Sequence, residues 1–122
     1  KERFVMMSDL EHTVVDGLKH PGLVSGITEV AKGIWMKHEK LNINQLIDYA
    51  KLLGNGATLR RLGFILELYE LANVEQLMYL RGLLTKTIQR LDPTLPAQGK
   101  ILTRWRLQLN VTTEELLAVR LA

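Results

Sequence analysis

The sequence predicts a predominantly helical α+β domain, with about six helices and a small sheet of about three strands. Apolar residues recur at helical spacing over residues 10–84 and 113–121, whereas apolar and polar residues alternate over 87–91 and 102–110. The chain has 122 residues, of which 47% are hydrophobic and 24% charged, as is typical of one globular domain. We therefore expect residues 1–122 to form a single domain.

The first helix is predicted to begin at Ser8 and to end before Pro21. The Ser8 hydroxyl can accept a hydrogen bond from the first turn while Glu11 reaches back to the Ser8 N–H, which is a capping box. The short apolar run before it, residues 4–7, is predicted as a buried strand. The inner face of the helix carries Leu10, Val14 and Leu18.

Three more helices are predicted to follow. The inner face of the second carries Ile27, Val30, Ala31, Ile34 and Trp35. Asn42 is predicted to cap the third, with Gln45 in the reciprocal position, and Gly54 ends it. Residues 57–71 are apolar on most sides, which predicts a central helix around which the others pack. Gly63 within it predicts that another backbone crosses close by.

The last two helices are predicted from their caps. Asn73 is predicted to cap the fifth through Gln76, and Thr112 opens the sixth. The residues expected to face inward from the fifth are Val74, Leu77, Met78 and Leu84. Those that give the sixth its apolar character are Leu116, Leu117 and Leu121.

Residues 87–91 and 102–110 are predicted as two strands of a C-terminal hairpin, with a turn at Asp92-Pro93. Strand 4–7 could pair with this hairpin. Alternation in the longer strand places Trp105, Leu107 and Leu109 on one face and Arg104, Arg106 and Gln108 on the other.

The basic residues gather in the same region. The net charge of the chain is +3, yet residues 84–110 hold five lysines and arginines against one aspartate. The five are Lys86, Arg90, Lys100, Arg104 and Arg106. If they converge across the hairpin, they form a surface for phosphate groups or an acidic partner. The alternative is a solvated sheet face that discourages aggregation at an edge strand.

The sequence contains little that points to catalysis. It has no cysteine, and its only serines, Ser8 and Ser25, lie in no nucleophile motif. His12, Asp16 and His20 share a helix face, but surface pairing of this kind is commoner than a metal site. No apolar run approaches the ~20 residues of a membrane span. We expect no catalytic residue, no metal and no cofactor.

Arg60 and Arg61 precede the most apolar stretch of the chain. At least one guanidinium should therefore lie near the core, and we expect it to be paired with a carboxylate. The candidate partners are Glu11, Asp16 and Glu67.

Four separated regions of the sequence together suggest a family. Their residues are Ser8-x-x-Glu11-x-Thr13-x-x-Asp16 with Pro21 following, then Tyr49-Ala50 and Arg60-Arg61-Leu62-Gly63-Phe64-x-x-Glu67, then Leu91-Asp92-Pro93, and finally Arg104-Trp105-x-Leu107-x-x-Asn110. In order and spacing they resemble the C-terminal domain of AbiEi-type antitoxins over about residues 3–111. The residues that we carry over, as scaffold and not as an active site, are Ser8, Glu11, Thr13, Asp16, Arg60, Arg61, Gly63, Glu67, Asp92, Pro93 and Trp105.

The resemblance implies a cytoplasmic, non-enzymatic antitoxin and regulatory domain of a bacterial type IV toxin–antitoxin system. Such domains usually follow a winged-helix domain that binds the operator of their own operon, and they counteract a nucleotidyltransferase-like toxin. Because the chain opens at Lys1, we expect it to be a piece of a longer protein whose missing part holds that winged helix. The alternatives are a helical protein-interaction or dimerisation module, and a metal-dependent nuclease or transferase remnant with clustered carboxylates.

Overall fold

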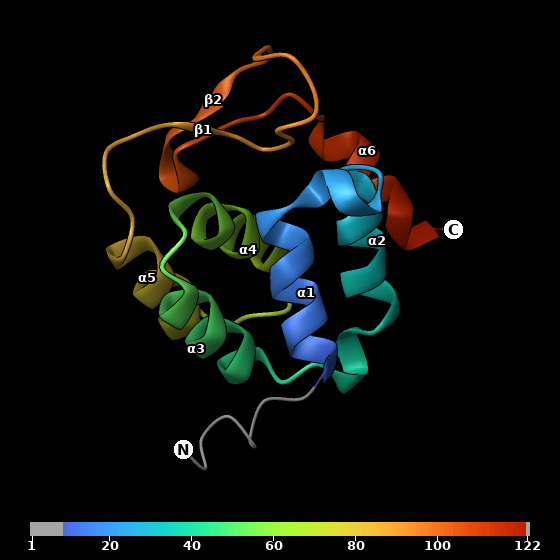
Figure 1. Ribbon diagram of the computed structural model, residues 1–122, viewed down its shortest axis with the longest axis vertical. Coiled ribbons are helices and arrows are strands. Elements are labelled where there is room, and N and C mark those ends of the chain that lie inside the picture. The colour runs from blue at the N-terminus through green and yellow to red at the C-terminus, as the bar shows by residue number, and fades with distance from the viewer. Residues whose placement is uncertain (1–8, 122) are drawn as a thin grey trace.

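Helix α4 (Gly56–Leu68) lies at the centre of the fold, as its apolar composition predicts. In the computed structural model, which describes residues 9–121, helices α1, α3 and α5 pack against it (Figure 1). The remaining helices of this part of the chain are α1 (Asp9–Lys19), α2 (Ile27–Met36), α3 (Ile43–Leu53), α5 (Val74–Gly82) and α6 (Thr113–Ala118). The strands are β1 (Gln89–Arg90), β2 (Ile101–Leu102) and β3 (Leu107–Gln108). The predicted fold class, a mainly helical α+β domain, is confirmed.

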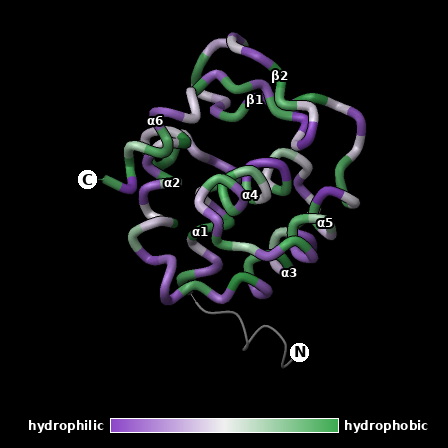
Figure 2. Tube along the Cα trace, turned by 180° about the vertical axis from the view of Figure 1, so that it is seen from behind, coloured by the Kyte–Doolittle hydropathy of each residue, from purple (hydrophilic) through white to green (hydrophobic). Residues whose placement is uncertain are grey.

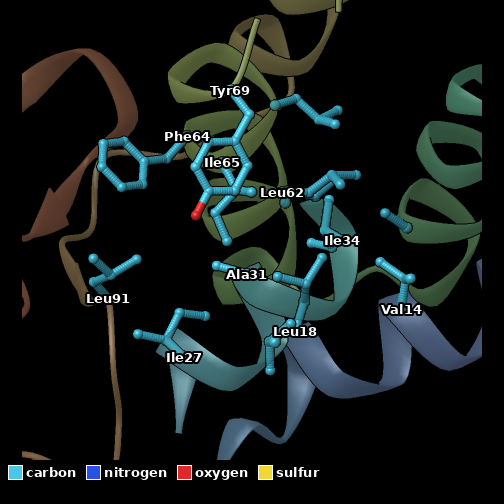
Figure 3. Close-up of a cluster of buried hydrophobic side chains, with 14 of the residues drawn as sticks. Val14, Leu18, Ile27, Ala31, Ile34, Leu62, Phe64, Ile65, Tyr69 and Leu91 are labelled. Atoms are coloured by element: carbon cyan, nitrogen blue, oxygen red, sulfur yellow. The ribbon is translucent and has the colours of Figure 1, made fainter. Parts of the chain in front are cut away.

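The core forms where α1, α2 and α4 meet (Figure 3). Leu18, Ile34 and Leu62, one from each helix, are completely buried and face one another there. Hydrophobic and hydrophilic residues alternate along the outer helices (Figure 2), so each presents an apolar face to this core. Burial of this apolar surface is the main force that holds the helices together.

Three predicted helix caps are present. The side chains of Asn42, Asn73 and Thr112 accept hydrogen bonds from the backbone N–H three residues further on. Asn73 and Thr112 complete reciprocal capping boxes, but the N–H of Asn42 donates to Glu11 Oε2 at 2.7 Å instead of to Gln45. Helix α3 is therefore fastened to α1 at its first turn. The other predicted features at this end, Ser8 as a cap and strand 4–7, lie outside the described residues.

Asn55 is a cap that the sequence did not predict. Its side chain accepts hydrogen bonds from both the N–H and the hydroxyl of Thr58. Gly54 ends α3 in the left-handed conformation, with φ of 70°, so α4 begins two residues later. The Gly54–Gly56 segment both ends one helix and begins the next.

The predicted hairpin is wrong in its topology. Strand β1 pairs in parallel with β3, and β3 pairs antiparallel with β2, which gives the order β1-β3-β2. The segment predicted as one strand, 102–110, is broken by a 3₁₀ turn, η4 (Thr103–Trp105), and by Arg106 at φ of 54°. The antiparallel hairpin therefore spans residues 101–108, so that the segment predicted as one strand supplies parts of both of its strands. The burial alternation is confirmed, since Trp105, Leu107 and Leu109 are buried.

The inward face predicted for α5 is confirmed for Leu77 and Leu84 and wrong for the other two residues. Val74 and Met78 are 70% and 63% exposed, whereas Leu80 is completely buried. Leu77 and Leu84 are half-buried, so the helix turns its Leu77–Leu80 side to the core. In the C-terminal segment Leu116 is buried, but Leu121 is exposed.

Candidate functional site

An open cleft of about 700 Å³ separates the C-terminal half of α5 from η4. Both elements pack against α4, so a rigid base holds the two walls. The cleft is lined by Met78, Arg81, Gly82, Leu84, Thr103, Arg104 and Arg106. Three of these residues are arginines and none is acidic. The lining therefore combines apolar side chains with an excess of positive charge. We call it the arginine cleft.

One edge of the Arg104 guanidinium is held in place. Its Nε donates to Glu67 Oε1 at 3.1 Å, and the same oxygen accepts from the indole Nε1 of Trp105 at 2.7 Å. Within the described residues the two terminal nitrogens of Arg104 donate no hydrogen bond. A guanidinium fixed at Nε presents its other edge for a bidentate contact with a carboxylate or phosphate.

Arg106 occupies a left-handed backbone conformation, with φ of 54°. A residue other than glycine there costs on the order of 1 kcal/mol. This turn separates η4 from β3 and places the Arg106 charge near the buried Arg60. Burial lowers the pKa of Arg60, and the charge of Arg106 lowers that pKa further. An anion in the cleft would relieve this like-charge repulsion.

The buried arginines bind backbone carbonyl oxygens and not the predicted carboxylates. Arg60 donates through its terminal nitrogens to the carbonyl oxygens of Gly56, Thr85 and Thr87 at 2.8 to 3.2 Å. Arg61 donates to the carbonyl oxygens of Leu18 at 2.9 Å and Arg90 at 3.1 Å. Both guanidinium groups thus serve as cross-links that fasten the 85–90 segment to α4, and Arg61 also closes the C-terminal turn of α1.

The three carboxylates predicted as partners for these arginines bind elsewhere. Glu11 accepts from the N–H of Asn42, Asp16 pairs with His12 at 3.3 Å, and Glu67 binds Trp105 and Arg104. Free carbonyl oxygens at a helix C-terminus and in a chain segment without full strand pairing can take the place of a carboxylate. Burial lowers the pKa of Arg61 to about 10, partly offset by the charge of Asp92 and reinforced by that of Arg90.

Asp92 joins three parts of the fold. Its carboxylate accepts from the backbone N–H of Ile27 at 3.0 Å and from both the N–H and the hydroxyl of Thr94. Its own backbone exchanges two hydrogen bonds with the Asn110 side chain. Burial raises the pKa of Asp92, but the hydrogen bonds from Thr94 and Ile27 and the charge of Arg61 outweigh this, so the pKa lies below its usual value.

The five predicted basic residues are distributed over two clefts and the remaining surface. Arg104 and Arg106 line the arginine cleft, and Arg104 also lines a second cleft, of about 300 Å³, together with Lys100. Arg90 lines neither cleft and donates to the carbonyl of Leu95 at 2.8 Å. Lys86 is exposed and lines neither cleft.

Arg81 is the one charged residue of the cleft lining that the sequence did not predict. It lies on a helix 23 positions before Arg104, so only the packed structure brings the two together. A signal for it was present, because Arg81 follows Val74 and Met78 at helical spacing on one face of α5.

Most of the residues that carry the family resemblance are buried. Those buried are Glu11, Arg60, Arg61, Gly63, Asp92 and Trp105. Pro93 and Glu67 are half-buried, Thr13 and Asp16 are exposed on α1, and Ser8 lies outside the described residues. Gly63 faces the indole ring of Trp105, which corrects the prediction that a second backbone crosses there.

Metal binding has no visible site in the described part of the chain. Residues 9–121 contain no group of three or more His, Asp or Glu side chains placed to hold an ion. His12 contacts the ring of Tyr49, with centroids 4.6 Å apart, as well as Asp16. None of the helices within residues 9–121 has the length and apolar character to cross a bilayer.

The chain has no significant match among protein-family models, curated proteins or solved structures.

Proposed function

We propose that this chain is the antitoxin and regulatory domain of a bacterial transcriptional autorepressor that controls a toxin–antitoxin operon. The observation that carries this proposal is the hydrogen bond from Trp105 Nε1 to Glu67, which joins two of the sequence blocks that resemble AbiEi-type antitoxins. Asp92 and Asn110, which also belong to these blocks, are joined to each other by two hydrogen bonds. Residues far apart in the sequence thus meet in pairs, as expected for the signature of a shared fold.

In this proposal the domain acts by binding and not by catalysis. The arginine cleft is its contact surface, since it offers the free edge of Arg104 beside Arg81 and Arg106. Recognition of operator DNA belongs to a winged-helix domain in the longer protein. The arginine cleft adds at most auxiliary contacts to acidic groups such as the phosphates of the DNA backbone. The domain works in the cytoplasm and requires no metal or cofactor.

A protein-interaction module without any nucleic-acid role is the second candidate. The exposed apolar residues of α5 favour it, because such side chains beside a basic cleft are typical of partner surfaces. This candidate shares the arginine cleft with the first and differs in having no link to a toxin.

The test is growth of cells that express the nucleotidyltransferase-like toxin encoded beside the gene, with and without the full-length protein. We expect co-expression to restore growth, and a full-length protein with Glu67→Leu and Trp105→Ala, which dismantles the network, serves as the inactive control. Continued arrest while the unaltered protein accumulates in folded form would refute the antitoxin role.

Titration of the upstream DNA of the gene at two salt concentrations tests the regulatory half. We expect the full-length protein to bind with strong salt dependence through its winged helix. Charge reversal at Arg104 and Arg106 flattens that dependence by about one unit per lost phosphate contact only where the cleft itself touches the DNA. Full-length protein that shows no affinity for this DNA would exclude autorepression.

A further inference from the structure

The outer face of α5 is apolar where a surface helix is ordinarily polar. Val74 and Met78, one helical turn apart, are 70% and 63% exposed. Each of these side chains leaves apolar surface in water that a partner could cover. We call these two residues the α5 stripe.

The α5 stripe continues into the arginine cleft. Met78 belongs to both, and Leu84 extends the apolar lining on the far side of Gly82. Nothing lies within 4 Å of the position that a Cβ would take at Gly82, so the passage between stripe and cleft is open. A bound segment could therefore run along α5 and enter the cleft without a change in the backbone.

The charge of the cleft selects what can bind there. Arg81, Arg104 and Arg106 line it and no acidic residue does, while Glu67 outside the lining binds only the Nε edge of Arg104. Arg106 also repels the buried Arg60. These arginines favour an occupant that carries carboxylates, because it would satisfy free guanidinium edges and lower the repulsion.

We propose that the arginine cleft and the α5 stripe together bind an acidic, partly apolar segment of a protein partner. The proposal rests on the proposed function in one respect, that the domain acts by binding a partner. A nucleic-acid backbone would satisfy the arginines but leave Val74 and Met78 in water, whereas a peptide with alternating acidic and apolar residues matches both parts.

Fluorescence anisotropy with the 122-residue chain tests this with three labelled probes. The probes are a peptide of glutamate and leucine arranged on two faces of a helix, a polyglutamate peptide of equal charge, and a short DNA duplex. We expect the glutamate–leucine peptide to bind most tightly. Arg81→Glu should weaken its binding about tenfold, and Met78→Ser about fivefold.

The matched controls lie on α2, on the opposite side of the fold from α5 (Figure 1). Met36→Ser removes a methionine that is 68% exposed, and Lys32→Glu reverses an exposed charge. All four substituted residues are exposed, so each variant should keep the unfolding temperature of the unaltered chain. We expect both α2 variants to bind the peptide with unchanged affinity.

Three results would overturn the proposal. One is equal binding of polyglutamate, and another is a Met78→Ser variant that binds as the unaltered chain does. The third is tighter binding of the duplex, weakened by Arg81→Glu and not by Met78→Ser, which would make the cleft a phosphate site. None of these results affects the growth assay with the toxin, so the failure of this proposal and that of the antitoxin role can be told apart.

Discussion

Trp105 is the buried side chain that attaches the C-terminal region to α4. Its ring is completely buried against α4, and its indole N–H donates to Glu67 at the same helix. Removal of a buried indole costs about 3–5 kcal/mol, through the lost burial of apolar surface and the cavity left behind. The ring can approach α4 closely only because residue 63 has no side chain.

Gly63→Ala should therefore be strongly destabilising. A Cβ at this position would overlap three carbons of the Trp105 ring, and we expect the free energy of unfolding to fall by about 1–3 kcal/mol. Gly33→Ala is the matched control, because Gly33 is exposed within α2 and nothing lies within 4 Å of its Cβ position. That variant should gain up to about 1 kcal/mol. Urea unfolding of both measures the difference, and equal effects would contradict the packing described.

At this scale the sequence indicated which residues matter better than it indicated their partners. A glycine inside an apolar helix predicts a close neighbour, but only tertiary packing makes that neighbour a tryptophan ring. Likewise, adjacent arginines in an apolar helix predict buried charge. Apart from Gly56, their acceptors are the carbonyl oxygens of segments 25 or more residues away, which no local pattern reveals.

Helix α5 shows what caps and periodicity can predict at the scale of an element. Its N-terminus was predictable, because the Asn73–Gln76 capping box is entirely local. Its inward face was not, since apolar residues lie on both the Val74–Met78 side and the Leu77–Leu80 side. Contact with α4 decides which side is buried.

Asn73→Ala should lower the free energy of unfolding by about 1 kcal/mol and increase fraying of the N-terminal turn of α5. The reason is that the N–H of Gln76 loses its acceptor at 2.8 Å. Hydrogen exchange at the Gln76 amide should accelerate more than exchange in α3. Asn73→Asp keeps the acceptor and should retain both stability and protection. Equal protection in the alanine variant would show that the cap contributes nothing.

The sheet was predictable only in part. Alternation of buried and half-buried residues holds from Trp105 to Leu109, yet the left-handed Arg106 and the η4 turn interrupt the strand. Strands of two residues carry too little sequence to specify a partner, so pairing follows from where α4 and the buried arginines hold the 85–90 segment. The same reason explains the arginine cleft, whose walls come from a helix and a turn on separate parts of the chain.

At the scale of the molecule, Asp92 connects the helical and sheet regions. Its carboxylate binds the N-terminus of α2, and its backbone is bound by Asn110, just beyond β3. It is 4% exposed, so its hydrogen bonds compete little with water. Gly26 is required beside it, because a Cβ there would lie 2.9 Å from the carboxylate oxygen and the backbone has φ of 107°.

Because of this connection, we expect the stability of the whole domain to fall as the pH becomes acidic. Burial of Asp92 raises its pKa, but its hydrogen bonds and Arg61 lower it more, so the folded-state pKa lies below the unfolded value near 3.8. The unfolded chain therefore takes up this proton first. The contribution of Asp92 is fully present above about pH 5, well above the unfolded value, and is lost progressively as the pH falls through the folded-state pKa. Asp92→Asn should lower the free energy of unfolding at pH 7 by about 1–3 kcal/mol and flatten its dependence on pH below 4.

Urea unfolding at several pH values between neutrality and the acid limit would measure both effects. Asp48→Asn is the charge-matched control, because it removes an exposed carboxylate of α3 and should leave the contribution of Asp92 to the acid limb in place. If Asp92→Asn and the unaltered chain lose stability in parallel as the pH falls, the acid sensitivity arises elsewhere. In that case Asp92 would connect the two regions through hydrogen bonds whose strength does not depend on its charge, and Thr94 and Ile27 would bind the neutral carboxyl equally well.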